Sequence, residues 1–493
     1  MKQPSSLIVA PRAPALVEAL RAVGYSLETA VADLLDNSIT ATAKRIWVDF
    51  HWNGEGSWIR IIDDGRGMTS DELTEAMRPG TRNPLEERAQ GDLGRFGLGL
   101  KTASFSQARR LSVASRRDGI VSVRCWDLDH IGTTGEWHLW LSAPPETAAL
   151  LELPPGNANG TVVVWEKLDR VVGKKRVDDR DAHNHFLRRI DSVREHLEMV
   201  FHRYLEGEAL KIFVNGRTEG HRIEGWDPFI RWHQSTLPTP AESIGQVKVQ
   251  GFVLPHRDRF EGEEAARKAG GPAGWSAQQG FYIYRHRRML VAGGWLDLGY
   301  QNEEHYKLAR ISVEIPNTLD QAWNIDVKKS RARPPGELRQ RLRDLADNTR
   351  KQAREVFVHR GKQQPRRASA EPLARPWAPH IHDGRQSYRI QRNHPLVKHV
   401  LAAASAEQRK SLEAMLRLVE ETVPVQQIWL AVSETPETLA KPFGGEASPE
   451  VKKLMRTIYD AFRKTGTAEE ARHRLRLMEP FDAFPTLIEA LDD

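Results

Sequence analysis

Two polar side chains within residues 28–37, ETAVADLLDN, could act together on one bound molecule. The apolar spacing predicts a helix, and Asp33 and Asn37 lie one turn apart on a single face of it. A carboxylate can accept a proton from an attacking water while a carboxamide oxygen ligates Mg²⁺, which is what phosphoanhydride hydrolysis requires. By itself the pair is more typical of a solvated helix surface, and Asp36 with Asn37 could simply end the helix.

A second group of candidate residues follows a predicted strand. Alternating apolar residues at 44–50 and 58–62 predict two strands joined by a tight turn. Gly65 and Gly67 would let the backbone approach a planar ligand, and a buried Asp63 could accept a hydrogen bond from an exocyclic amine. An ordinary Asp-Gly turn is the alternative. The full stretch is Asp63, Asp64, Gly65, Arg66, Gly67 and Met68.

The third motif is glycine-rich, GDLGRFGLGLKTAS at residues 91–104. Its glycines precede a helix-like run, so amide groups at a helix N-terminus could hold phosphates. The motif matches neither better-known phosphate loop, because Leu100 separates the last glycine from Lys101 and the order is G-x-x-G-x-G. The loop residues are Gly94, Arg95, Phe96, Gly97, Leu98 and Gly99.

In this order the motifs resemble those of the GHKL superfamily, named for gyrase, heat-shock chaperone, histidine kinase and MutL. Between the second and third motifs, the polar residues 69–93 suit a mobile lid. Gly160 and Thr161 open an apolar strand at 162–165, where the family places a Gly-Thr whose hydroxyl supports the adenine-binding Asp. The resemblance implies a GHKL (Bergerat) α/β sandwich over residues 1–205, in a chain of mixed α/β (α+β) class.

The resemblance also implies ATP and Mg²⁺ as ligands. Asn37 would ligate Mg²⁺ between the phosphates, and Asp63 would bind the adenine amino group. The glycine loop would wrap the phosphates, with Lys101 close behind. The residues implied to contact the nucleotide are Asn37, Asp63, Gly65, Gly67, Met68, Gly94, Arg95, Phe96, Gly97, Leu98, Gly99, Lys101 and Thr161.

The implied general base is Asp33, where the chain departs from the family pattern. Members that hydrolyse ATP usually carry Glu at this place. Aspartate is one methylene shorter, so its oxygen would lie about an ångström further from the water, which can cost about 10²-fold in rate. Slow turnover or a compensating shift of the helix follows. Glu28 and Asp36 are fallback bases, although neither matches the motif.

Residues 206–335 are similar to the ribosomal-protein-like transducer domain that follows the ATPase domain in gyrase, MutL and MORC-type proteins. A transducer lysine reaches the γ-phosphate in those relatives, and Lys328 and Lys329 are the candidates here. Both lysines could instead be solvated, and the sequence leaves open which one would act. The expected elements are a helix at 183–205 and strands at 210–214, 246–254, 281–291 around a basic turn, 311–315 and 323–329.

The rest of the chain is predicted to contain a basic helix at 336–362, a linker at 363–380 and a helical partner-binding region at 381–493. Residues 331–375 hold 13 Lys and Arg against 5 Asp and Glu, a net +8 that exceeds the +6 of the whole chain. This stretch could bind duplex DNA, or it could be a charged, solvated helix. Residues 381–493 contain no catalytic motif, and we expect a short strand at 388–390 and helices at 405–423 and 448–463.

Length and composition bound these predictions. A chain of 493 residues should form two or three domains. We expect no membrane segment, because no run of about 18 apolar residues occurs. The single cysteine, Cys125, allows no intramolecular disulfide and suits a reducing cytoplasm. A pI near 9.3 suggests affinity for polyanions.

We therefore expect an ATP-dependent conformational switch, most similar to bacterial MORC- and MutL-type proteins. The resemblance implies slow hydrolysis, homodimerisation on ATP binding, action on DNA in bacterial defence or repair, and protein partners encoded nearby. A histidine kinase would carry this domain last, gyrase would add a strand-cleavage tyrosine region, and a chaperone would have a longer middle domain. The alternative is a nucleotide-gated scaffold with little or no hydrolysis, which Asp33 favours.

Overall fold

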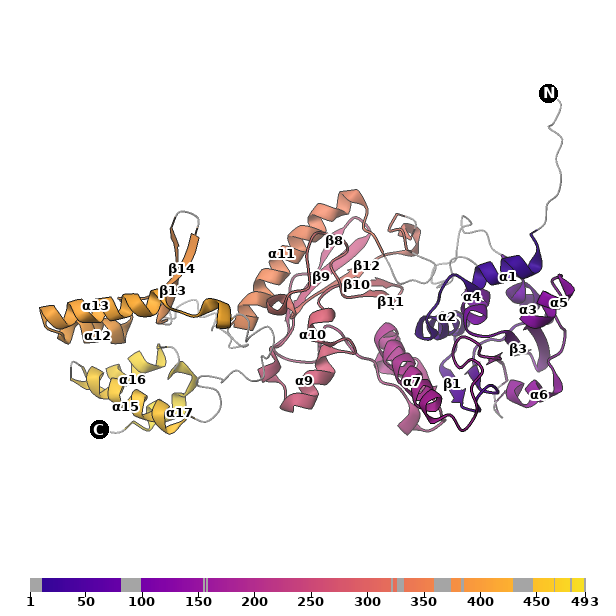
Figure 1. Ribbon diagram of the computed structural model, residues 1–493, viewed down its shortest axis with the longest axis horizontal. Helices are drawn as coiled ribbons and strands as arrows, with labels where there is room; N and C mark the ends of the chain where they lie inside the picture. Colours follow the sequence, from indigo (N-terminus) through magenta and orange to yellow (C-terminus); the bar gives the residue numbers. More distant parts are fainter. Residues whose placement is uncertain are drawn as a thin grey trace, which may run out of the picture. The chain divides into compact units, whose positions relative to one another are not determined.

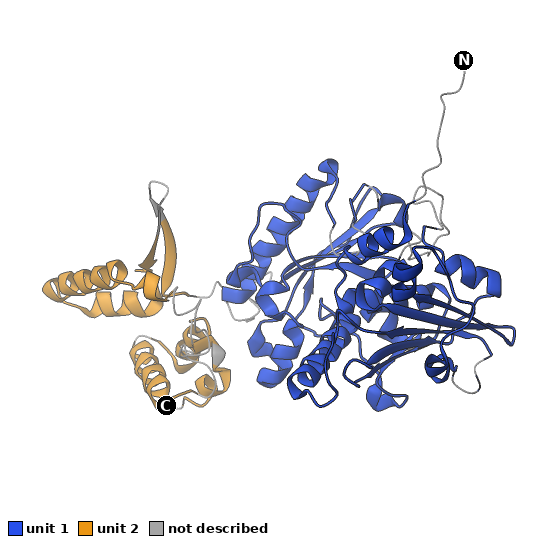
Figure 2. Ribbon diagram, turned by 45° about the vertical axis from the view of Figure 1, so that its right-hand side comes forward, with its two compact units in different colours: residues 1–363 blue, residues 364–493 orange. Residues whose placement is uncertain are grey.

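The computed structural model describes residues 11–80, 99–153, 156, 158–320, 322–325, 332–358, 374–382, 385–428, 447–464, 466–478 and 481–491. The chain divides into two compact units, residues 1–363 and 364–493 (Figure 2). The mixed α/β class and the helical C-terminal region are confirmed. No helix in these described ranges combines the length and the apolar character needed to cross a membrane.

The N-terminal domain contains a six-stranded sheet of order β4-β3-β5-β2-β1-β6. Neighbouring strands are antiparallel, except that β6 lies parallel to β1. β6 therefore extends this sheet past residue 205, where we expected the domain to end. The strands are β1 Arg45–His51, β2 Trp58–Asp63, β3 Arg110–Arg117, β4 Ile120–Asp127, β5 Gly160–Glu166 and β6 Lys211–Val214.

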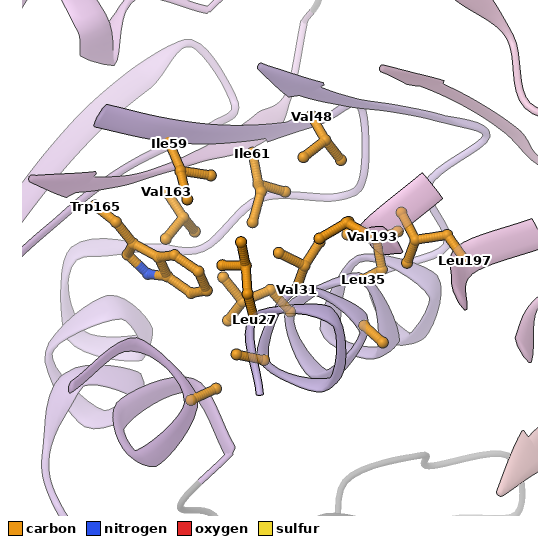
Figure 3. Close-up of a cluster of buried hydrophobic side chains, with 14 of the residues drawn as sticks. Leu27, Val31, Leu35, Val48, Ile59, Ile61, Val163, Trp165, Val193 and Leu197 are labelled. Atoms are coloured by element: carbon orange, nitrogen blue, oxygen red, sulfur yellow. The ribbon is translucent and has the colours of Figure 1, made fainter. Parts of the chain in front are cut away.

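Helices cover one face of this sheet, and α2 lies closest to its centre (Figure 3). α2 begins after Ser26, whose hydroxyl accepts a hydrogen bond from the Thr29 amide, and its apolar side chains point at β2 and β5. The opposite face is covered by α6 Pro145–Ala148 and the 3₁₀ helix η1 Ala149–Leu151. The other helices are α1 Ala13–Arg21, α2 Leu27–Thr40, α3 Ser70–Met77, α4 Gly99–Gln107, α5 Leu128–Thr134, α7 Arg180–Val200 and α8 His202–Leu205.

The first part of the predicted lid is a packed helix. α3 begins with a capping box, in which Thr69 and Glu72 bond to each other's backbone amides. Leu73 and Met77 on its inner face are fully buried in the N-terminal core. Burial of these two side chains fixes residues 70–77 on the domain, and residues 81–93 of the expected lid lie outside the described residues.

A second sheet, of order β11-β10-β12-β9-β7 with β8 beside β9, follows in the same unit (Figure 1). Its strands confirm those expected within 246–254, 281–291 and 311–315, whereas Trp323 lies in a turn and not in the expected strand. The elements are β7 Leu237–Pro238, β8 Glu242–Ile244, β9 Val247–Val253, α9 Gly262–Gly270, α10 Gly274–Ala277, β10 Gly280–Arg285, β11 Arg288–Ala292, β12 Ala309–Glu314 and α11 Gly336–Val358.

The two faces of the second sheet pack against different partners. Leu342, Leu345 and Ala346 of α11 cover one face. On the other face, Tyr282 and Met289 belong to the same apolar cluster as the N-terminal helices. The two domains of this unit therefore share a continuous core.

The second unit contains a β-hairpin and helices. β13 Trp377–His382 pairs with β14 Arg385–Ile390, so the segment expected to be a linker up to residue 380 includes a strand. A small core around Met455, Tyr459 and Leu475 holds the last helices together. The helices are α12 Pro395–Ala403, α13 Ala406–Glu421, α15 Pro449–Arg463, α16 Ala468–Arg476 and α17 Pro485–Glu489.

Substitution of Leu35 tests whether α2 is held by its apolar face. Leu35→Ala removes a fully buried side chain between α2 and the sheet, so it should lower the free energy of unfolding by about 2–5 kcal/mol. Leu187→Ala is the matched control on α7, because Leu187 is 45% exposed and its loss should change stability by less than about 0.5 kcal/mol. Urea unfolding measures both, and equal stability of the two variants would contradict this packing.

Candidate functional site

The second half of α2 carries polar residues with very different exposures. Asp33, Asp36 and Ser38 are buried, whereas Asn37 is exposed. Buried polar groups require hydrogen-bond partners, and each of these three has one on a different element. Among these four residues, Asn37 is therefore the one whose polar side chain is accessible to a ligand from solvent.

Asp33 lies beside the start of α4. The Tyr25 hydroxyl donates a hydrogen bond to Asp33 Oδ2 at 2.9 Å, which orients the carboxylate. A side chain at Gly99 would place its Cβ 3.7 Å from the same oxygen. The predicted base is thus adjacent to the first residue of the helix that follows the glycine loop. Gly94, Arg95, Phe96, Gly97 and Leu98 lie outside the described residues.

Asp63 is buried where β2 ends, and it is tied to α2. Its Oδ2 accepts a hydrogen bond from the Ser38 hydroxyl at 2.8 Å, and its Oδ1 accepts one from the Gly65 amide at 2.9 Å. Burial raises the pKa of Asp63 to about 6, although these hydrogen bonds lower it. At neutral pH the carboxylate is mostly ionised and can accept a further hydrogen bond, which suits an exocyclic amine.

The two glycines after Asp63 are required by the protein's own packing. A Cβ at Gly65 would lie 2.9 Å from the Ala41 carbonyl oxygen. Gly67 has φ +69°, and its Cβ would lie 1.9 Å from the Arg116 carbonyl oxygen. The sequence predicted that these glycines let the backbone approach a ligand. In the structure they let the turn approach the backbone at the end of α2 and the backbone of β3. Met68, the next residue, is half-buried.

Thr161 supports Asp63 through its backbone. The two residues are register partners across β2 and β5, and a hydrogen bond from the Thr161 backbone lowers the pKa of Asp63. The Thr161 hydroxyl lies 2.9 Å from Ser115 Oγ, which also accepts the Met68 amide hydrogen bond at 2.8 Å. Sequence analysis missed Ser115, since only the pairing of β3 with β5 brings it to the site.

Lys101 points from α4 to α3. Its side chain is 2% exposed, and Nζ donates to the Ala76 carbonyl oxygen at 2.9 Å. Burial lowers the pKa of Lys101 to about 8. In this structure the ammonium group therefore joins the two helices that flank the expected glycine loop.

The fallback bases have other partners. Burial by itself would raise the pKa of Glu28, but hydrogen bonds from Ser26 and Ser192 lower it. Asp36 forms an ion pair with Arg288 of β11, with 3.0 Å between Oδ1 and Nε. The Asp36 carboxylate is therefore bound to a residue of the second domain. Lys328 and Lys329 lie outside the described residues.

The donor set around Asn37 fits a magnesium ion bound chiefly by phosphate and water. Among the residues that the structure describes, no group of three or more His, Cys, Asp or Glu could hold a metal ion. Mg²⁺ usually keeps several waters and binds few protein oxygens together with substrate phosphates. An exposed carboxamide at Asn37 meets that requirement.

Comparison with known proteins agrees with this geometry. Residues 25–155 match the family described as histidine kinase-, DNA gyrase B- and HSP90-like ATPase. The N-terminal domain is therefore a GHKL ATPase domain, and the resemblance seen in the motifs is confirmed.

The similar proteins include two MORC proteins and a chaperone protein. ATPase morc-1 of Caenorhabditis elegans is 31% identical over 94 residues, which are 19% of this chain and 11% of that protein. Chaperone protein HtpG of Azorhizobium caulinodans is 35% identical over 97 residues, 17% of this chain and 15% of HtpG. The mouse MORC family CW-type zinc finger protein 3 is 28% identical over 97 residues, 19% of this chain and 10% of that protein. The chain thus matches only a small part of the length of each relative.

The raised pKa of Asp63 predicts a pH-dependent stability difference. A carboxyl group whose pKa is raised by folding stabilises the protein below its unfolded pKa of 3.8, and this contribution is lost as pH rises through about 6. Asp63→Asn removes this titration, so its stability relative to wild type should increase between pH 4 and pH 7.5 by on the order of 2–3 kcal/mol. Urea unfolding without nucleotide at both pH values measures this, and a pH-independent difference would contradict it.

Proposed function

We propose that this chain is an ATP-dependent conformational switch that binds ATP with Mg²⁺ and hydrolyses it slowly. One observation carries the proposal: α2 places Asp33 beside the start of α4, exposes Asn37, and is tied through Ser38 to the buried Asp63. The helix thus joins a candidate base, a candidate metal ligand and a candidate amine acceptor.

Each residue has a role that its surroundings support. Asp63 accepts the hydrogen bond of the adenine amino group, and the turn with Gly65 and Gly67 holds its carboxylate in place. Asn37 offers the protein oxygen for Mg²⁺, which neutralises phosphate charge when bound. Asp33 accepts the proton of the attacking water, and the Tyr25 hydroxyl fixes its orientation.

Slow turnover follows from the position of Asp33. Its carboxylate is both one methylene shorter than the usual glutamate and hydrogen-bonded to Tyr25. The alternative function is a nucleotide-gated scaffold with negligible hydrolysis, and the short side chain of Asp33 favours it.

We extend the proposal to ATP-dependent homodimerisation and to duplex DNA as a partner in a bacterial defence or repair system, beside protein partners. The net charge of residues 331–375 supports DNA as a partner, but several arginines of α11 bond to other residues of the protein itself. Arg339 and Arg343 donate to the backbone of Asp297 and Leu298, and Arg350 is buried against Glu303. DNA contact on α11 would fall to exposed residues such as Lys351 and Arg354.

Turnover with and without duplex DNA separates these functions. Stimulation of ATP hydrolysis by DNA supports the DNA-associated switch. Tight ATP binding with negligible turnover in both conditions supports the scaffold. Lys351→Gln/Arg354→Gln should reduce DNA stimulation and leave hydrolysis without DNA unchanged, because both side chains lie on α11, outside the nucleotide site.

Loss of Asn37 should abolish binding of ATP with Mg²⁺. Asn37→Ala removes the protein oxygen ligand of the metal and leaves phosphate charge uncompensated. Asn348→Ala is the matched control, since Asn348 is also an exposed asparagine on a helix, α11. Calorimetry with Mg²⁺ and ATP measures both, and unchanged affinity of Asn37→Ala would refute this role.

Substitution of Asp33 separates binding from hydrolysis. Asp33→Asn should still bind ATP, because binding depends on Asn37 and Asp63, while its hydrolysis rate should fall by about 10²–10⁴-fold. Asp33→Glu should raise the rate if the short side chain limits turnover, and should lower it if the helix has shifted to suit aspartate. Single-turnover hydrolysis by wild type and both variants distinguishes these outcomes. A wild-type rate in Asp33→Asn would exclude Asp33 as the base.

A further inference from the structure

The buried ion pair between Asp36 and Arg288 joins the helix of the nucleotide site to the second domain. Asp36 Oδ1 lies 3.0 Å from Arg288 Nε, and the two side chains are 2% and 4% exposed. The residues are 252 positions apart in the chain. Arg288 also stacks over the ring of Phe201, with its guanidinium carbon 4.8 Å from the ring centroid.

Asp36 is placed so that it must move with the site. It directly precedes Asn37 and lies three residues after Asp33, within one continuous helix. An α-helix is stiff over a single turn, because successive turns share hydrogen bonds. A displacement of Asn37 on ligand binding is therefore a displacement of Asp36.

Arg288 is equally well anchored on its own side. It is the first residue of β11, directly after the β10–β11 turn. At that turn Tyr204 donates to the His286 carbonyl oxygen, and Arg287 donates to the Arg203 carbonyl oxygen. On β10, Arg285 pairs with the buried Asp320 of the second domain. The β10–β11 hairpin is thus bound both to α8 and to Asp320 of the second domain. A movement of α2 would act on this hairpin through Arg288.

The chemistry of the pair makes it sensitive to small shifts. A buried charge is stable only while its partner stays in hydrogen-bonding geometry, because no water is present to replace that partner. Apolar contacts at the same interface, such as Met289 against the N-terminal core, tolerate sliding since they are not directional. The geometry of the ion pair therefore depends closely on the position of α2.

We propose that the Asp36–Arg288 ion pair transmits the nucleotide state of α2 to the β10–β11 hairpin of the second domain. The inference rests on the proposed function, since it takes ATP with Mg²⁺ as the ligand that acts on α2. Arg288 is a positioning residue in this scheme: it contacts the helix and not the nucleotide.

A second ion pair across the same two domains provides the control. Arg203 of α8 lies 2.7 Å from Glu314 of β12, and Glu314 is 48% exposed. This pair connects α8 to β12 and involves neither Asp36 nor Arg288. Glu314→Gln should weaken the interface while both residues of the Asp36–Arg288 pair stay unchanged.

The test compares hydrogen exchange in the full chain with and without Mg²⁺ and a non-hydrolysable ATP analogue. In wild type, the analogue should slow exchange in α2 and change exchange in residues 280–292. The variant Asp36→Asn/Arg288→Gln replaces the ion pair by two neutral amides, so it leaves no unpaired buried charge. It should bind the analogue and protect α2, but lose the response of residues 280–292. Glu314→Gln should keep that response.

The outcomes separate this inference from the proposed function. Failure of wild type to bind the analogue in calorimetry overturns the proposed function. Binding with the hairpin response retained in the neutral variant overturns the inference alone, as does loss of the response in Glu314→Gln. If thermal unfolding shows that the neutral variant does not fold, Arg288→Lys provides the same comparison, because lysine keeps the charge but not the directed Nε hydrogen bond.

Discussion

The structure depends on how one nearly surrounded helix satisfies its polar side chains. α2 packs against the first sheet beside α7 (Figure 3). It nevertheless carries Asp33, Asp36 and Ser38 in buried positions. A buried polar group without a partner destabilises a fold by about 1–3 kcal/mol, and a buried charge by more. Each side chain therefore fixes another part of the chain: Tyr25 at Asp33, Arg288 at Asp36, and the end of β2 at Ser38. The candidate site lies on the part of α2 that makes these three contacts.

The same requirement explains why the basic composition is a poor guide to the surface of this protein. Several arginines are interior structural groups, among them Arg21, which donates to the Phe105 and Ala108 carbonyl oxygens. Arg350 stacks on the rings of Tyr300 and Tyr306, at 4.3 and 3.9 Å from their centroids, and so fastens α11 to the second domain. Guanidinium groups suit such positions because they stay charged and stack on aromatic rings. Polyanion binding therefore depends on the exposed charges and not on the total.

The segment that matches the ATPase family contains only one partner of the Asp36–Arg288 ion pair. The match to the ATPase family covers residues 25–155, which hold α2, the Asp63 turn and the start of α4. The partner of Asp36 lies outside this range, on β11. Residues 25–155 include Asp36 but not Arg288, so the connection between α2 and the second domain depends on one residue inside the matched segment and one outside it.

The sequence alone predicted the helix that carries Asp33 and Asn37, the strand that runs into Asp63, and the order of the motifs. Apolar periodicity predicts such elements because it acts within a few residues along the chain. The hairpin of β10 and β11 was predicted for the same reason. Only the tertiary structure decided that β6 joins the first sheet, that Lys101 bonds to α3, that Ser115 bonds to Met68, and that Arg288 pairs with Asp36. These contacts join residues from 25 to 252 positions apart, where the identity of one residue carries no local signal of its partner, and the packing of sheet and helices alone brings them together.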